Sequence, residues 1–183
     1  MSEEMLITHC SPTLAGMKTG NLFCCPCESI GEIEEQIKQW NQVLSPKGVQ
    51  MTLLQMLKDR ALIYVYRPKK LRLDIQNEGA KCLLREQGYK SYEVNACISE
   101  LMNRLCTCEE FPHEIGLFLG YPLEDIKGFI EHKGKNCKCV GCWKVYCNEQ
   151  EARKTFAKYK RCTNIYKMKL QEGLPIERLV VGV

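Results

Sequence analysis

The chain has no long hydrophobic run. Its longest purely apolar stretch is Ala61–Tyr66, whereas a membrane-spanning helix needs about 20 consecutive apolar residues. The first residues, Met1–Met5, are partly acidic and contain neither a basic segment nor a long apolar one, so we expect no secretory signal. These absences predict a cytoplasmic protein that does not cross or bind a membrane, in a compartment where thiols stay reduced.

The sequence also lacks internal repeats, low-complexity segments and linkers rich in Pro, Gly or Ser. Its length of 183 residues is within the range of one domain. An apolar content of 45% with 26% charged residues is ordinary for a globular protein. We therefore predict a single domain over residues 1–183.

Signatures of common enzyme classes are absent as well. There is no Gly-rich phosphate loop, and neither a Ser–His–Asp set nor a pair of catalytic carboxylates can be assembled. His113-Glu114 resembles the start of a zinc-hydrolase helix, but the second histidine is missing because position 117 is Leu. The sequence therefore does not identify a reaction, and it favours a binding or accessory role over an enzymatic one.

Cysteine, in contrast, is abundant, with 13 residues. The odd number leaves at least one thiol unpaired in any intramolecular disulfide scheme. Disulfide scaffolds also compensate for cores too small to hold a fold, and a chain of this length does not need that compensation. We therefore do not expect a disulfide framework.

The densest group of cysteines is Cys137, Cys139, Cys142 and Cys147. Four thiolates in a short span could close a tetrahedral zinc or iron–sulfur site, and Cys139-x-x-Cys142 alone would fit a redox pair. The spacing matches neither a paired zinc ribbon nor a ferredoxin, and a turn at Val140-Gly141 would be needed to gather the sulfurs. Buried or incidental thiols are the alternative.

His9-Cys10 lies between a strand predicted over residues 5–8 and a helix predicted to begin at Ser11-Pro12. A helix N-terminus lowers the pKa of a nearby thiol, which makes Cys10 a candidate nucleophile assisted by His9 or Lys18. Cysteine-dependent phosphatases have a similar loop, but they need an arginine six positions after the cysteine, where this chain has glycine. Lys18 cannot bind phosphate bidentately. The alternative is a tight junction in which His9 and Cys10 pack or cap.

Positive charge is concentrated between Lys127 and Lys169. This segment holds nearly half of the 26 Lys and Arg residues but only three of the 22 acidic ones. Within it, a long predicted helix carries Lys154, Lys158 and Arg161 on one face. Such a face could bind an acidic protein, or nucleic acid through its phosphates, although no known nucleic-acid-binding signature accompanies it. A solvated basic helix is the alternative.

Periodicity predicts the remaining elements. Ser29–Glu32 forms a capping box that opens an amphipathic helix, and Val49–Leu57 with Ala61–Tyr66 predicts an antiparallel hairpin with a bulge near Leu53-Leu54. In one helix, Cys97 and Cys108 fall on an apolar face and are expected in the core. The other expected elements are helices through residues 68–133, a strand at 139–147, a helix from 149 that stops at Gly173, and an edge strand at 179–181. The predicted class is α+β: a helix-rich single domain with a small, mostly antiparallel sheet that includes a hairpin.

Three segments resemble a known family. They are His9–Phe23, then Phe111–Pro122 with Asp125 and Gly128–Ile130, and then Gly141 with Trp143–Tyr146. These segments are similar to the bacterial domain of unknown function family 3793, small proteins of anaerobic, mostly Gram-positive bacteria. The resemblance covers essentially the whole chain, and it assigns no site residue.

The resemblance implies single-domain cytoplasmic proteins whose genes lie near those for flavodoxin or ferrous-iron transport. We therefore expect a binding or accessory protein in iron or redox metabolism, acting with an acidic electron carrier such as a flavodoxin. A thiol-dependent enzyme that uses Cys10, and a nucleic-acid-binding protein that uses the basic segment 127–169, are the alternative hypotheses.

Overall fold

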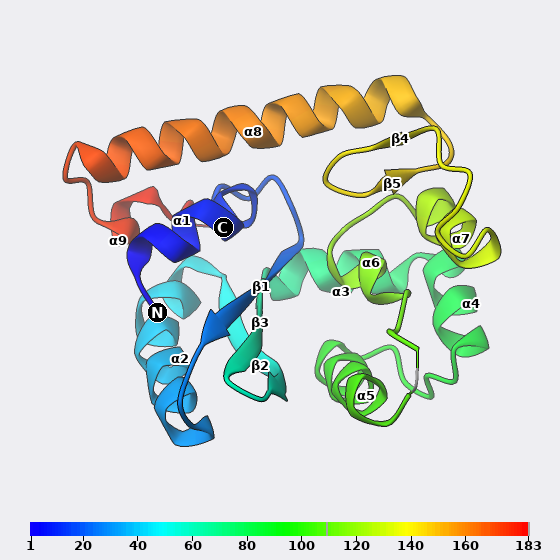
Figure 1. Ribbon diagram of the computed structural model, residues 1–183, viewed down its shortest axis with the longest axis horizontal. Coiled ribbons are helices and arrows are strands. Elements are labelled where there is room, and N and C mark those ends of the chain that lie inside the picture. The colour runs from blue at the N-terminus through cyan, green and yellow to red at the C-terminus, as the bar shows by residue number, and fades with distance from the viewer. Residues whose placement is uncertain (109, 183) are drawn as a thin grey trace. The chain divides into compact units, whose positions relative to one another are not determined.

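The computed structural model describes residues 1–108 and 110–182 and separates into two compact units (Figure 1). Unit 1 comprises residues 1–71 and the chain from Arg161 onward, and unit 2 comprises residues 72–160. Helices and small antiparallel sheets make up both units, which confirms the predicted α+β class. None of the helices in the described part of the chain is long and apolar enough to span a membrane.

Unit 1 contains a three-stranded antiparallel sheet. Its strands are β1 (Gly20–Pro26), β2 (Gln50–Leu57) and β3 (Arg60–Tyr66), in the order β1–β3–β2. The predicted hairpin is confirmed, and so is its bulge, because the register of β2 against β3 shifts between Leu53 and Gln55. The sequence prediction missed β1, which pairs along β3 over its whole length.

The start of the chain is a helix and not the predicted strand. Helix α1 (Glu3–Leu14) begins at Ser2, whose hydroxyl accepts a hydrogen bond from the backbone N–H of Met5. Ser11-Pro12 therefore lies near the end of this helix and does not begin one. The prediction was wrong because it took this Ser-Pro pair as the start of a helix. The N-cap is Ser2, which is followed by two glutamates in the first turn.

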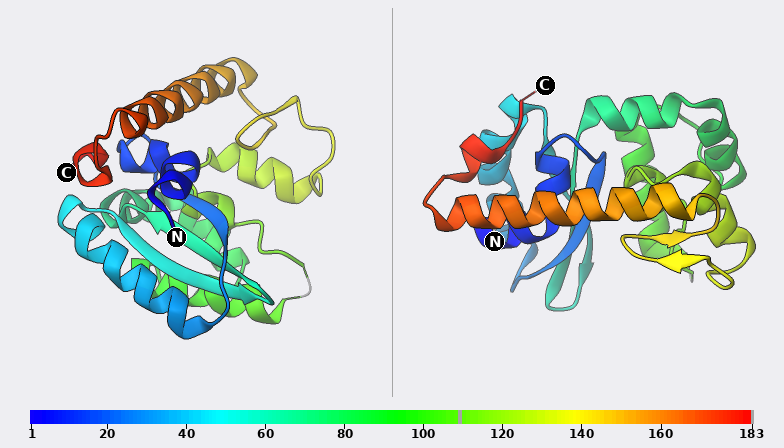
Figure 2. Two further views of the ribbon diagram at one scale, coloured as in Figure 1. Left: turned by 60° about the vertical axis from the view of Figure 1, so that its left-hand side comes forward. Right: turned by 90° about the horizontal axis from the view of Figure 1, so that it is seen from above.

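Helices pack against the sheet of unit 1 and close its core. Helix α2 (Ile30–Leu44) is capped by Ser29 as predicted and leads into a short 3-10 helix, η1 (Ser45–Lys47). Near the end of the chain lies α9 (Ile176–Leu179); the edge strand predicted at 179–181 is not formed, because Leu179 belongs to this helix and residues 180–181 are not in a strand. Apolar side chains from α1, α2, α9 and all three strands form one buried cluster. Figures 1 and 2 show α2 running alongside the sheet.

Unit 2 is mainly helical. Its elements are the end of α3 (Pro68–Gln76), α4 (Glu78–Glu86), α5 (Val94–Thr107), α6 (Ile115–Phe118), α7 (Leu123–Glu131), the strands β4 (Cys139–Val140) and β5 (Lys144–Val145), and the first part of α8 (Glu149–Gln171). The predicted helical character of residues 68–133 is confirmed, as is the long helix from residue 149 that stops before Gly173.

Two further predictions in unit 2 were wrong. The segment 139–147 is a short hairpin, β4–β5, rather than one continuous strand, because the chain turns between Val140 and Lys144. Cys97 is buried in the core as predicted, but Cys108 is exposed. Helix α5 ends at Thr107, so Cys108 lies beyond the apolar face on which periodicity placed it.

Candidate ligand-binding site

A buried carboxylate fixes the β4–β5 hairpin of unit 2 onto α7. Asp125 lies on α7, and its Oδ2 accepts a hydrogen bond of 2.7 Å from the indole Nε1 of Trp143. Its Oδ1 accepts bonds from the backbone N–H groups of Tyr146 and Cys147, at 2.8 and 2.9 Å. Charged acceptors form the stronger hydrogen bonds in proteins. The three bonds therefore hold the strand and the Trp143 ring in one orientation.

Two glycines let the hairpin approach its neighbours closely. A Cβ added at Gly128 on α7 would lie 2.7 Å from side-chain carbons of Tyr146, and one at Gly141 in the hairpin would lie 2.2 Å from the ring of Phe156 on α8. Only a residue without a side chain fits at such contacts. Trp143 then packs edge-on against Phe156, with ring centroids 4.5 Å apart.

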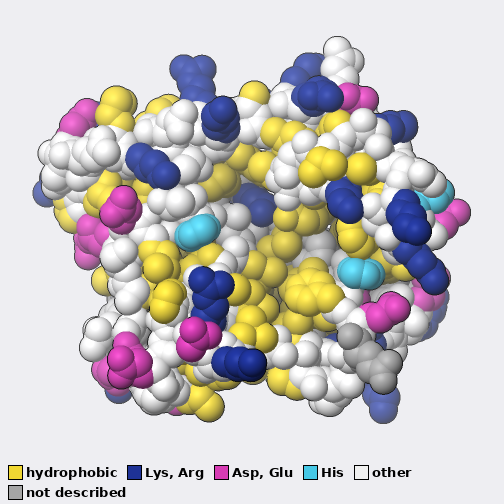
Figure 3. All heavy atoms as spheres, viewed as in Figure 1, with side chains coloured by type: hydrophobic (Ala, Val, Ile, Leu, Met, Phe, Trp, Pro, Cys, Tyr) yellow, Lys and Arg dark blue, Asp and Glu magenta, His cyan; other side chains and the backbone are white. Residues whose placement is uncertain are grey.

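This packing leaves a cavity of about 350 Å³ whose wall is mainly apolar and includes the rings of Phe, Tyr, Trp and His residues. That volume falls within the range of small-molecule sites, which are concave and mainly apolar with a few polar groups. Figure 3 shows hydrophobic side chains gathered over the region where Figure 1 draws α6, α7, β4 and β5, with Lys and Arg side chains beside them. The cavity is lined by Phe111, His113, Ile115, Gly116, Tyr121, Asp125, Ile126, Phe129, Val140, Gly141, Trp143 and Lys144.

The aromatic wall is ordered by ring contacts. His113 meets Phe129 edge-on at 4.8 Å, and Tyr121 lies 5.1 Å from Trp143 between ring centroids. The Nζ of Lys144 lies 5.5 Å from the centroid of the Phe129 ring and donates a hydrogen bond of 2.8 Å to the carbonyl of Gly134. Flat rings that are already in place would bind a planar ligand at little entropic cost.

A second and more polar cavity, of about 770 Å³, adjoins the first. Phe111, His113, Phe129 and Lys144 line both. The remaining lining residues of the second cavity are Gln87, Arg104, Cys108, Glu110, Pro112, Glu114, Ile130, Lys133 and Gly134.

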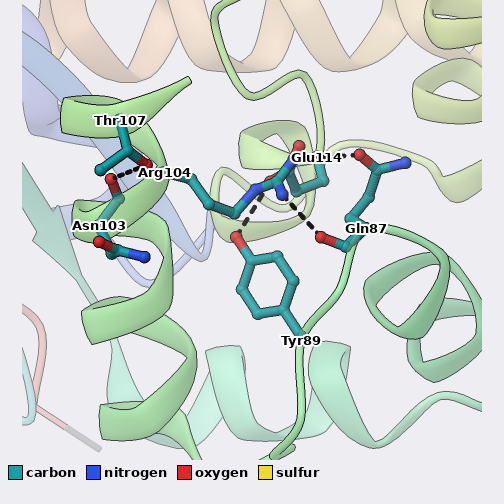
Figure 4. Close-up of polar contacts among 6 residues, drawn as sticks. All are labelled: Gln87, Tyr89, Asn103, Arg104, Thr107 and Glu114. Carbon is teal, nitrogen blue, oxygen red and sulfur yellow. Dashed lines mark hydrogen bonds and ion pairs between the residues drawn. The ribbon is translucent and has the colours of Figure 1, made fainter.

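A hydrogen-bonded cluster forms the wall of this second cavity (Figure 4). Glu114 is buried, and its Oε1 accepts hydrogen bonds from Nε of Arg104 at 2.6 Å and from the hydroxyl of Tyr89 at 3.1 Å. Arg104 also donates to the carbonyl and the side-chain oxygen of Gln87. Burial lowers the pKa of Arg104, but the hydrogen bond and charge of Glu114 outweigh this and raise it. The pair is therefore mutually neutralised, and it joins α5 to the segment before α6.

The candidate nucleophile lies in a different environment from the one predicted. Cys10 is in the C-terminal half of α1 and is fully buried. Burial raises the pKa of its thiol, and the charge of Lys18 opposes this only in part. His9 is exposed and stacks on Phe23. A reactive cysteine needs a lowered pKa and access to solvent. Cys10 has neither, and its predicted position at a helix N-terminus is wrong.

The four clustered cysteines lie around the β4–β5 hairpin. Cys142 and Cys147 are exposed, whereas Cys137 and Cys139 are half-buried. The turn required to gather them is present. Nevertheless, across residues 1–108 and 110–182, no three His, Cys, Asp or Glu side chains are grouped so that they could hold a metal ion.

The predicted basic face is exposed on α8. Lys154, Lys158 and Arg161 are all accessible, but Lys154 is paired with Glu151 at 2.7 Å, one helical turn earlier. Acidic residues of the first turn of α8 therefore neutralise part of the positive charge that the sequence analysis expected to bind an acidic partner.

Sequence reasoning missed the aromatic cavity. Its ring-bearing residues Phe111, Tyr121, Phe129 and Trp143 occur in the segments that carry the family resemblance, but they were given no role because their spacing follows no known motif. The available signal was the concentration of aromatic residues and histidine between positions 111 and 146.

The fold is that of an α+β protein with a largely apolar cavity in unit 2. Over residues 6–180 the chain matches the family described as "Protein of unknown function (DUF3793)", and it belongs to that family. No curated protein and no solved structure matches this chain.

Proposed function

We propose that unit 2 binds a small molecule with a planar, apolar ring system, and that the protein is a binding or accessory protein rather than an enzyme. The observation that carries this proposal is the aromatic cavity held open between α7 and the β4–β5 hairpin. Two apolar side chains at its edge, Phe111 and Val140, are 52% and 68% exposed. Exposed apolar groups beside a concave site favour a ligand that covers them.

We further propose that this role belongs to iron or redox metabolism in the cytoplasm of an anaerobe, which is what the family resemblance implies. The cavity supports a ligand-binding role because its one buried carboxylate, Asp125, is already occupied by three N–H donors. A group saturated in this way holds structure and is poorly placed to move protons.

The test is a titration with N-phenyl-1-naphthylamine, a neutral aromatic dye that fluoresces in apolar sites. Wild-type protein should bind it saturably. The Phe111→Ala substitution removes one aromatic side chain from the cavity lining, and this should weaken dye binding about five- to tenfold. Leu73→Ala is the matched control, because Leu73 is 73% exposed and lies outside the cavity. Absence of saturable binding, or equal affinity of the Phe111→Ala variant and wild type, would overturn the proposal.

A second candidate role is docking of an acidic protein, such as a flavodoxin, on α8. It is supported by the exposed side chains of Lys158 and Arg161, which form no ion pair within the described residues. At low ionic strength, a flavodoxin should bind wild type more tightly than a Lys158→Gln/Arg161→Gln variant. Lys90→Gln/Lys135→Gln removes the same charge from exposed positions elsewhere. Equal binding by both variants would exclude this role for α8. Nucleic-acid binding stays a prediction from charge alone.

A further inference from the structure

The two adjoining cavities of unit 2 differ in chemistry. The first is walled by aromatic rings, whereas the second contains most of the charged groups. Lys144 stands at the junction: its side chain lines both cavities and lies over the ring of Phe129. A ligand in the aromatic cavity therefore has a lysine beside it and a polar cavity beyond.

The charge in the second cavity is mainly positive once internal pairing is considered. Arg104 and Glu114 cancel each other through their ion pair. Lys133 and Lys144 have no ion-pair partner within the described residues, and the only other acidic side chain in the lining is the exposed Glu110. An anionic group would therefore be attracted to this cavity, and most strongly at Lys144, which is less exposed than Lys133.

The backbone at Lys133 supports a role in binding. Helix α7 ends in a Schellman arrangement, in which the N–H of Lys133 bonds the carbonyl of Ile130 and the N–H of Gly134 bonds that of Phe129. The residue after the C-cap must then be left-handed, and glycine is usual there. Here it is Lys133, at φ +49°. A residue with a side chain is strained in this conformation, so a lysine occupies a position at the rim where glycine would fit more easily.

We infer that the ligand of unit 2 is an amphipathic aromatic anion: its ring system enters the aromatic cavity, and its acidic group lies in the adjoining cavity beside Lys133 and Lys144. This inference rests on the proposed function and specifies the class of the ligand. The anion adds a partner of opposite charge to Lys133 and to Lys144, whose Nζ also donates to the Gly134 carbonyl, and the ring contacts Phe111, Phe129 and Trp143.

Two dyes with the same ring system test the inference. Anilinonaphthalene sulfonate carries an acidic group that N-phenyl-1-naphthylamine lacks. Wild-type protein should bind the sulfonate about tenfold more tightly than the neutral dye at low salt, with the preference shrinking as salt is added. Lys144→Gln should weaken sulfonate binding about three- to tenfold, and by a clearly larger factor than it weakens binding of the neutral dye, because Lys144 also lines the aromatic cavity.

Lys133→Gly provides a variant that we expect to fold as wild type does. It relieves the left-handed backbone strain, so its Tm should be equal to or higher than that of wild type, while sulfonate affinity falls about threefold. Lys135→Gln is the matched control: it removes one charge from the same loop, at an exposed residue that lines neither cavity.

The outcomes separate the two proposals. If the two dyes bind with equal affinity, and if both affinities fall in the Phe111→Ala variant but not in the lysine variants, the inference is overturned and the proposed function stands. If neither dye binds saturably, the proposed function itself falls. If Lys135→Gln weakens sulfonate binding as much as Lys133→Gly and Lys144→Gln do, the effect is general surface charge, and the inference is again overturned.

Discussion

The indole Nε1 of Trp143 donates a hydrogen bond of 2.7 Å to Oδ2 of Asp125. Because the other oxygen of this carboxylate binds two backbone N–H groups beyond β5, a single buried side chain orders both the hairpin and one wall of the aromatic cavity. The site therefore depends on Asp125 for its shape.

This dependence predicts the effect of Asp125→Asn. An amide can still accept from the two backbone N–H groups, but its NH₂ then faces the indole N–H, and two donors oppose each other. Urea denaturation should show a loss of about 1–3 kcal/mol in the free energy of unfolding. Glu124→Gln, an exposed neighbour on the same helix, should change it by less than about 0.5 kcal/mol. Similar values for the two variants would contradict this role of Asp125.

A buried arginine in unit 1 links the end of α1 to the segment after α9. The guanidinium of Arg67 donates to the carbonyls of Thr13 and Leu14 at the end of α1 and to that of Val181, at 2.6–2.7 Å. Arg67→Lys keeps the charge but cannot reach three acceptors, so it should destabilise the protein by about 2–4 kcal/mol. Arg178→Lys, at an exposed position of the same unit, is the control for urea denaturation. A loss at Arg67 no larger than at Arg178 would show that these bonds contribute little.

Thiol labelling should follow burial along β1 and α1. Cys24 is exposed, whereas its neighbour Cys25 and Cys10 on α1 are buried and have raised pKa values, chiefly through desolvation. Iodoacetamide at neutral pH should therefore label Cys24 at least about a hundredfold faster than Cys10, as measured by peptide mass spectrometry. In urea the difference should disappear. Equal native rates would restore the hypothesis of a reactive Cys10.

Stability should fall at alkaline pH, partly through Cys97. Burial raises the pKa of this thiol from its ordinary value of 9.0 to about 11. Because the unfolded chain releases this proton first, the contribution of Cys97 is complete below pH 9 and is lost as the pH rises to about 11. Urea denaturation at pH 8 and pH 10 should show a smaller decrease for Cys97→Ala than for wild type. An equal decrease in the free energy of unfolding for Cys97→Ala and wild type would show that other groups cause the effect.

The accuracy of sequence reasoning differed with the range of the interactions that decide each element. The Ser29 cap and the β2–β3 hairpin with its bulge depend on neighbouring residues, and both were predicted correctly. The strand assigned to residues 5–8 failed because so short a run fits either structure, and burial against the sheet decides for α1. The cavity depends on Gly128, Gly141 and Asp125 meeting partners far along the chain, which local patterns do not reveal.

The most direct test of the central claim uses the two tryptophans of the chain as paired reporters. Trp143 lines the aromatic cavity, whereas Trp40 lies on α2 in unit 1. In a ¹⁵N–¹H spectrum the two indole N–H signals can be assigned with a Trp40→Phe variant. Titration with anilinonaphthalene sulfonate should shift the Trp143 signal saturably and leave the Trp40 signal in place. A shift of Trp40 alone, equal shifts of both, or no shift of Trp143 at saturating dye would contradict a ligand site in this cavity.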